Sequence, residues 1–107
     1  MRSFASLRRR GDFARLRRHG RRIATRSLTI YRANAQGKQA LVGISTGRAI
    51  GGAVTRNRVR RRILAIVDEI SRGGDLPGRL LIEARPTAAS LGFDKLKSEL
   101  VGAVATP

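Results

Sequence analysis

The sequence predicts a small α/β (α+β) domain, a two-layer sandwich of one β-sheet and its helices, with elements in the order α-β-β-α-β-α. Stretches rich in apolar and β-branched residues, typical of strands, alternate with stretches in which apolar residues recur at helical spacing. The chain has 107 residues, 41% of them hydrophobic, so residues 1–107 can bury one modest core as a single domain.

The first predicted helix lies within GDFARLRRHG, residues 11–20. Asp12 is a favourable N-cap, because its side chain can accept a hydrogen bond from a free backbone N–H of the first turn. Gly20 is a favourable residue to follow the last turn. Phe13 and Leu16 are three residues apart and share one face, so a short helix is expected here.

Residues 21–33, RRIATRSLTIYRA, are predicted to be extended. Because side chains alternate along a strand, Leu28 and Ile30 lie on one face and Thr29 and Tyr31 on the other. The pattern does not decide whether this stretch is one strand or two.

Two further strands complete the predicted sheet. Residues 34–38, NAQGK, form a loop, and residues 39–46, QALVGIST, form the next strand. The last strand lies near residues 80–86, after the turn signal Pro77-Gly78. Its apolar run indicates a central position in the sheet.

Two more helices lie between and after these strands. One begins near Thr55 and ends before Gly73-Gly74, and the other begins at about Gly92. Apolar residues form a stripe along one face of each helix. These are Val59, Ile63, Ile66, Val67 and Ile70 in the first, and Phe93, Leu96, Leu100 and Val104 in the second.

Positive charge is concentrated in the first 62 residues. Lys and Arg total 23 against 7 Asp and Glu, a formal net charge of +16, and residues 1–62 alone hold +17. Twenty of these cations are arginine, whose planar fork binds phosphate and stacks on bases. The composition predicts a nucleic-acid partner, with an anionic membrane surface as the rival.

Several function classes are disfavoured. The chain has no cysteine and one histidine, which excludes thiol nucleophiles and most histidine-based metal or catalytic sites. The acidic residues from Asp68 onward lie outside the basic region, so an intrinsic metal-dependent nuclease is not expected. No apolar run is long enough to cross a membrane. The Arg-rich start resembles a transit peptide but is better explained as structure.

The stretch TRNRVRRRIL crowds five arginines at the start of the longest predicted helix. Arg58 and Arg61 point away from the apolar stripe on the helical wheel. Arg60 and Arg62 flank the stripe, and Arg56 lies in the first turn. Each cation near the positive end of a helix dipole costs about 0.3–1 kcal/mol.

The helix start offers no local compensation for these cations. Thr55 can cap the helix, but no Glu follows three residues later to complete a capping box. A solvated basic face would mix both signs of charge. A phosphate removes the conflict, because free backbone N–H groups and the helix dipole already favour an anion there. We therefore interpret this helix start as a binding site for RNA or DNA.

The stretch VGISTGRAIGGAVTRNRVRRRIL, residues 42–64, resembles the signature of the bacterial ribonuclease P protein subunit. Members of that family have a strand, a glycine-containing link and an Arg-Asn-Arg trio that opens a basic helix. Arg56-Asn57-Arg58 matches the trio, and VRRR continues it. DFARLRRHGRR near the start, and the IEARP strand followed by a final helix, extend the likeness over nearly the whole chain.

The resemblance implies a fold and an activity. The family fold, shared with one domain of a ribosomal protein, has a mixed sheet and a left-handed β-α-β crossover, against the usual right-handed rule. In this family the catalyst is a large RNA, which removes the 5′ leader of precursor tRNA. The Mg²⁺ ions it needs are held by the RNA and the substrate. The implied partners are this catalytic RNA and precursor tRNA, in the cytoplasm, with no membrane and no protein partner required.

The resemblance also assigns site residues. Leader contact relies more on charge here than is usual in the family, because Arg17 stands where a second aromatic is common and Arg48-Ala49 where Lys-Lys is common. Core packing stays open as an alternative for the two aromatic residues, although the strand alternation favours a cleft position for Tyr31. The predicted contacts to the catalytic RNA are Arg56, Asn57, Arg58, Arg60 and Arg61, and the predicted leader-binding residues are Phe13, Arg17, Tyr31 and Arg48.

Two other functions stay open. A ribosomal-type RNA-binding protein would bind RNA without accelerating leader removal. A cationic membrane-active protein would need a large apolar face beside the arginines, whereas the first helix offers only Phe13 and Leu16.

Overall fold

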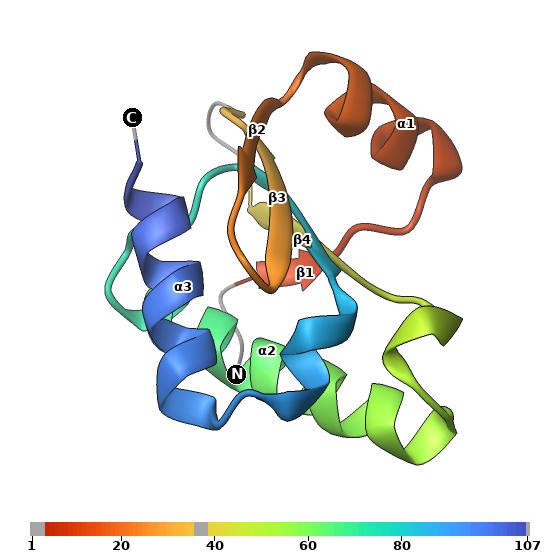
Figure 1. The fold of residues 1–107 in the computed structure, drawn as a ribbon. Helices are drawn as coiled ribbons and strands as arrows, with labels where there is room; N and C mark the ends of the chain where they lie inside the picture. Colours follow the sequence, from red (N-terminus) through yellow and green to blue (C-terminus); the bar gives the residue numbers. More distant parts are fainter. Residues whose placement is uncertain (1–3, 36–38, 107) are drawn as a thin grey trace.

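One mixed β-sheet has helices packed on both of its faces (Figure 1). The computed structural model describes residues 4–35 and 39–106. The predicted order of elements is confirmed, with residues 21–33 divided into two strands, and a short first strand is added. The elements are β1 (Phe4–Ser6), α1 (Arg10–His19), β2 (Arg21–Ala24), β3 (Leu28–Ala33), β4 (Ala40–Thr46), η1 (Arg48–Ile50), α2 (Ala53–Arg72), β5 (Arg79–Ala84), η2 (Pro86–Ser90) and α3 (Phe93–Ala105).

Within the described residues, five strands lie in the order β1-β4-β5-β3-β2. β4 pairs in parallel with β1 and β5, whereas β3 pairs antiparallel with β5 and β2. β5 therefore lies at the centre, as its apolar run predicts. β4, α2 and β5 form a β-α-β unit, and the left hand of its crossover stays a prediction of the family resemblance.

The larger core lies between the sheet and helices α2 and α3. Leu28 and Ile30 of β3 are fully buried there, as are Leu80 and Ile82 of β5. The predicted stripes of both helices supply the other side of this core. Their buried members are Val59, Ile63, Ile66 and Val67 of α2, and Leu96, Leu100 and Val104 of α3.

The opposite face of the sheet is covered by α1. Leu16 of α1 forms a second, smaller cluster with Leu7 and with Leu81 of β5. Gly43 of β4 permits the close approach of this helix, because a Cβ at that position would lie 2.9 Å from Cε1 of Phe13. α1 therefore rests directly on the middle of the sheet.

The predicted ends of α1 need correction. The helix begins at Arg10 with Arg9 as its N-cap, so Asp12 lies in the first turn instead of capping it. Its carboxylate is still favourable there, near the positive end of the helix dipole. Gly20 does follow the helix, but with an extended backbone (φ −72°). Glycine suits this position because a Cβ would lie 2.6 Å from the Leu16 carbonyl oxygen.

Two other predicted features also change. α2 begins at Ala53 with Gly52 as its N-cap, so Thr55 is not the cap. The reason lies in the preceding turn, where Gly51 has a φ of 146° that favours glycine and lets the helix start earlier. Of the predicted loop 34–38, residues 36–38 lie outside the described residues.

The start of α2 contains no internal compensation for its arginines. Gly52 makes no side-chain cap, and the first turn holds no acidic residue. Like charges also face each other at i, i+4 spacing, as in the pair Arg58 and Arg62, which is unfavourable. The buried stripe, rather than the helix start, therefore holds α2 in place.

Removing one of these cations is expected to stabilise the protein. In Arg58→Ala the repulsion from Arg62 and from the helix dipole is relieved, so the free energy of unfolding should rise by about 0.3–1 kcal/mol at low salt. Urea unfolding at two salt concentrations measures this gain, which should shrink as salt screens the charges. Arg72→Ala is the matched control, because Arg72 pairs with Asp68 at 2.8 Å at the other end of α2. Equal losses of stability in both variants would contradict the prediction.

Candidate nucleic-acid interface

The candidate interface begins where β4 ends and α2 starts. Thr46, the last residue of β4, lines a hollow of about 320 Å³ with Ala53, Arg56, Asn57 and Arg60 of α2. Three predicted RNA contacts therefore share one hollow at the positive end of a 20-residue helix. Such an end favours phosphate oxygens.

Two arginines of this stretch already have partners in the protein. Nη1 of Arg62 donates to the Leu91 carbonyl oxygen at 2.9 Å, which ties the segment before α3 to α2. Nη1 of Arg60 donates a longer bond, 3.3 Å, to the Ile44 carbonyl oxygen of β4. Arg62 is half-buried and structural, whereas Arg60 is exposed and keeps its other donors.

The side chains of the other four arginines of this region have no partner among the described residues. In the part of the chain that the structure describes, Arg48, Arg56, Arg58 and Arg61 form no hydrogen bond through their side chains and no ion pair. Asn57 is exposed beside them and offers an amide that can both donate and accept. We call these four arginines with Asn57 and Arg60 the arginine surface. The arginine surface contains all five predicted RNA contacts and the predicted leader residue Arg48, and it surrounds the start of α2.

The predicted cleft residues Phe13 and Tyr31 lie on the α1 face of the sheet. Both pack against the cluster of Leu7, Leu16 and Leu81, and both remain half-buried rather than enclosed. The two interpretations of these aromatic residues are therefore compatible. Each residue packs on the small core and still has part of its surface exposed.

Arg17, the third predicted cleft residue on this face, is not a free cation. Its Nε and Nη2 both donate to Oε2 of Glu83 on β5, at 3.0 and 2.7 Å. Its guanidinium carbon lies 6.0 Å from the centroid of the Phe13 ring. The prediction missed Glu83, although the alternation of β5 places it on the same face as Leu81. That alternation is the signal that identifies it.

The two groups of residues lie toward one side of the molecule. In Figure 1, α1 and the start of α2 are both at the right of the view, and α3 is at the left. β4 connects the groups, because Gly43 receives Phe13 of α1 and Thr46 lines the hollow at α2. β4 thus lies beside one member of the first group, Phe13, and three of the second, Arg56, Asn57 and Arg60.

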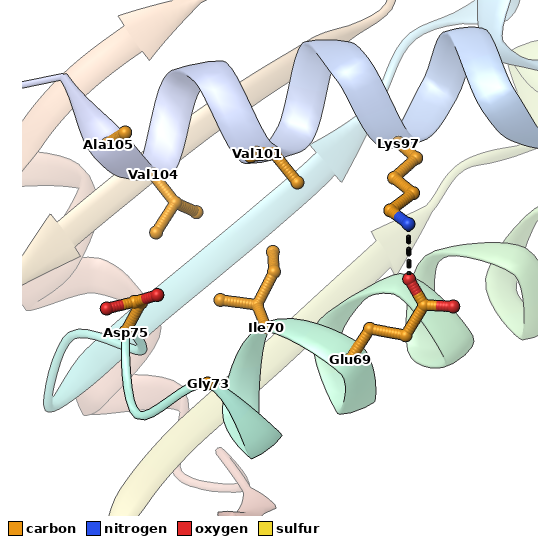
Figure 2. Close-up of a pocket in the computed structure, with 8 residues that line it drawn as sticks. All are labelled: Glu69, Ile70, Gly73, Asp75, Lys97, Val101, Val104 and Ala105. Carbon is orange, nitrogen blue, oxygen red and sulfur yellow. Dashed lines mark ion pairs between the residues drawn. The ribbon is translucent and has the colours of Figure 1, made fainter.

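A different hollow, of about 600 Å³, lies between the end of α2 and α3 (Figure 2). Lys97, the cation in its lining, is paired with Glu69 at 2.8 Å, and the hydrogen bond to that carboxylate raises the pKa of Lys97. Without an uncommitted cation this hollow does not suit a polyanion. Its lining residues are Glu69, Ile70, Gly73, Asp75, Lys97, Val101, Val104 and Ala105.

The arginine surface presents positive charge and guanidinium N–H donors, which can bind phosphate. Across residues 4–35 and 39–106, no three His, Cys, Asp or Glu side chains gather in a way that could hold a metal ion.

Over the same residues, no helix has both the length and the apolar character needed to span a membrane.

Sequence comparison places the chain among known proteins. The ribonuclease P family model matches residues 1–106. The ribonuclease P protein component of Acidothermus cellulolyticus is 40% identical over 99 residues, which cover 87% of this chain and 79% of that protein. The ribonuclease P protein component of Thermobifida fusca is 37% identical over 108 residues, with 92% and 72% covered.

Solved structures have the same fold. The ribonuclease P protein of Staphylococcus aureus, as a mutant with defective mRNA degradation activity, gives a TM-score of 0.83 at 22% identity and covers 92% of this chain and 84% of its own. The ribonuclease P protein of Thermotoga maritima gives 0.77 at 20% identity, with 92% and 94% covered. The predicted α/β fold is thereby confirmed. On the family model and the sequence relatives together, the chain belongs to the family of ribonuclease P protein components.

Proposed function

We propose that this chain binds the catalytic RNA of ribonuclease P and the 5′ leader of precursor tRNA, and so assists removal of the leader. The observation that supports this most directly is the arginine surface, whose guanidinium groups lack carboxylate partners within the described residues. Cations that are unpaired in the free protein can release counterions from RNA when they bind phosphates. The leader then lies on the α1 side, against Phe13 and Tyr31.

We assign the chemistry of cleavage to the RNA. The described residues offer no three-ligand cluster, so a Mg²⁺ ion would be held by the RNA and the substrate rather than by this protein. The protein contributes phosphate contacts and a surface for the leader. No further protein partner is needed for this role, and the cytoplasm, where tRNA precursors are processed, is its expected location.

The arginine surface should determine the salt dependence of RNA binding. Replacing Arg58 and Arg61 by alanine is expected to weaken binding to the ribonuclease P RNA. The slope of log K against log salt should also become shallower by about 0.7–0.9 for each phosphate that the variant no longer binds. Filter binding over a series of salt concentrations measures this slope.

A matched control separates these two arginines from general charge. Arg72→Ala with Lys95→Ala removes the same charge from exposed positions outside the arginine surface. That control should change the slope much less. An unchanged slope in the Arg58 and Arg61 variant would reject their assignment to the catalytic RNA.

Tyr31 should distinguish leader-bearing from mature tRNA. Tyr31→Ala removes an aromatic face that stacks on a leader base, an interaction worth about 1–3 kcal/mol, so precursor tRNA should lose that affinity while mature tRNA loses little. The comparison is made with the reconstituted holoenzyme. Tyr31→Phe keeps the aromatic ring and should keep the preference for precursor tRNA over mature tRNA. An equal loss for both RNAs would assign Tyr31 to core packing alone.

A further inference from the structure

Glu83 is an unexpected residue for a surface that binds RNA. It lies on the same face of β5 as Leu81, the centre of the cluster on which Phe13 and Tyr31 pack. A carboxylate there repels phosphate and lowers the attraction of the surface for a polyanion. The ion pair with Arg17 adds little to the stability of the fold, so stability does not explain why a carboxylate stands at this position. The two side chains are 47% and 28% exposed, and exposed ion pairs contribute little to folding.

The geometry of the pair suggests a different purpose. Nε and Nη2 of Arg17 both point at one oxygen of Glu83, so one edge of the planar guanidinium is held. The guanidinium also lies over the Phe13 ring, with its carbon 6.0 Å from the ring centroid. Holding an edge leaves the side of the guanidinium that is turned away from Phe13 available. Bases of single-stranded RNA stack on arginine planes as well as on aromatic rings.

We propose that Glu83 is a positioning residue that holds Arg17 over Phe13 as a flat platform on which a leader base stacks. This role rests on the proposed function, because it requires the leader to lie on the α1 face. Arg17 then contacts the leader through its face, and its charge is largely neutralised by Glu83. Without Glu83 the same guanidinium would be a mobile cation, free to bind a phosphate instead.

The two modes of binding differ in a measurable way. Stacking on a platform requires the base and adds little salt dependence, whereas binding a phosphate ignores the base and steepens the salt dependence. A precursor tRNA whose leader nucleotides are abasic keeps every phosphate and has no leader base. The ratio of dissociation constants for the abasic and the normal leader therefore reports stacking.

The test compares Glu83→Ala with the unmodified protein, each in the reconstituted holoenzyme. In the unmodified protein the abasic leader should bind about fivefold more weakly or worse, as expected for at least one stacked base. In Glu83→Ala we expect this ratio to fall by about threefold or more. The salt slope for the normal leader should steepen by about 0.7, the value for one bound phosphate in single-stranded RNA.

Two further variants isolate the role of Glu83. Asp94→Ala removes the same charge from an exposed residue of α3, which packs on the other face of the sheet, and should leave the ratio unchanged. Arg17→Phe supplies a ring that needs no holding, so adding Glu83→Ala to it should not lower the ratio further. Thermal unfolding of Glu83→Ala checks that the fold is retained.

Each outcome decides the proposal. If Glu83→Ala changes binding of both leaders by the same factor, so that the ratio stays as expected for Asp94→Ala, Glu83 acts only through its charge and the proposal is wrong. If the unmodified protein binds normal and abasic leaders equally well but prefers both to mature tRNA, the platform is rejected and the proposed function stands. If the unmodified protein does not prefer leader-bearing tRNA at all, the leader contact and the role of Glu83 fail together.

Discussion

The burial of one apolar stripe on α2 is the interaction on which the rest of this structure depends. Val59, Ile63, Ile66 and Val67 are fully buried against the sheet, and burial of such side chains contributes about 1.5–3 kcal/mol each. The cations at the start of the same helix cost about 0.3–1 kcal/mol each. Hydrophobic burial therefore outweighs the electrostatic cost. It holds α2 in place although the arginines at its start destabilise the helix. Because the protein tolerates this conflict without resolving it, the arginines remain free for phosphate.

The sheet gives the two binding groups their common frame. β4 passes under α1 at Gly43, where the absence of a side chain admits Phe13, and it ends at Thr46 in the hollow beside α2. The same strand thus positions an aromatic surface on one face and an arginine surface at its end. On the first surface Arg17 is paired with Glu83, whereas the cations of the arginine surface have no carboxylate partner within the described residues. This contrast suits two different ways of binding RNA, one through bases and one through the backbone.

Much of this arrangement follows from local pattern, and the exceptions have physical causes. The stripes of α2 and α3 and the alternation of β3 are periodic, so the core faces could be predicted. β1 has three residues, too few to show a period. The start of α2 follows a positive φ at Gly51, and that of α1 follows the extended backbone of Arg9, whose carbonyl accepts hydrogen bonds from Asp12 and Phe13, so neither Thr55 nor Asp12 is the cap. The partners of Arg17 and Arg62 are set by tertiary approach over 66 and 29 residues, which no local pattern contains.

We propose that this protein binds a catalytic RNA and that the RNA performs the cleavage. The most direct measurement is cleavage of a precursor tRNA by a bacterial ribonuclease P RNA at low Mg²⁺, with and without this protein. We expect strong stimulation by the protein and no cleavage by the protein alone. Tight RNA binding without stimulation would contradict this proposal, and would indicate a ribosomal-type RNA-binding protein whose arginines serve another RNA.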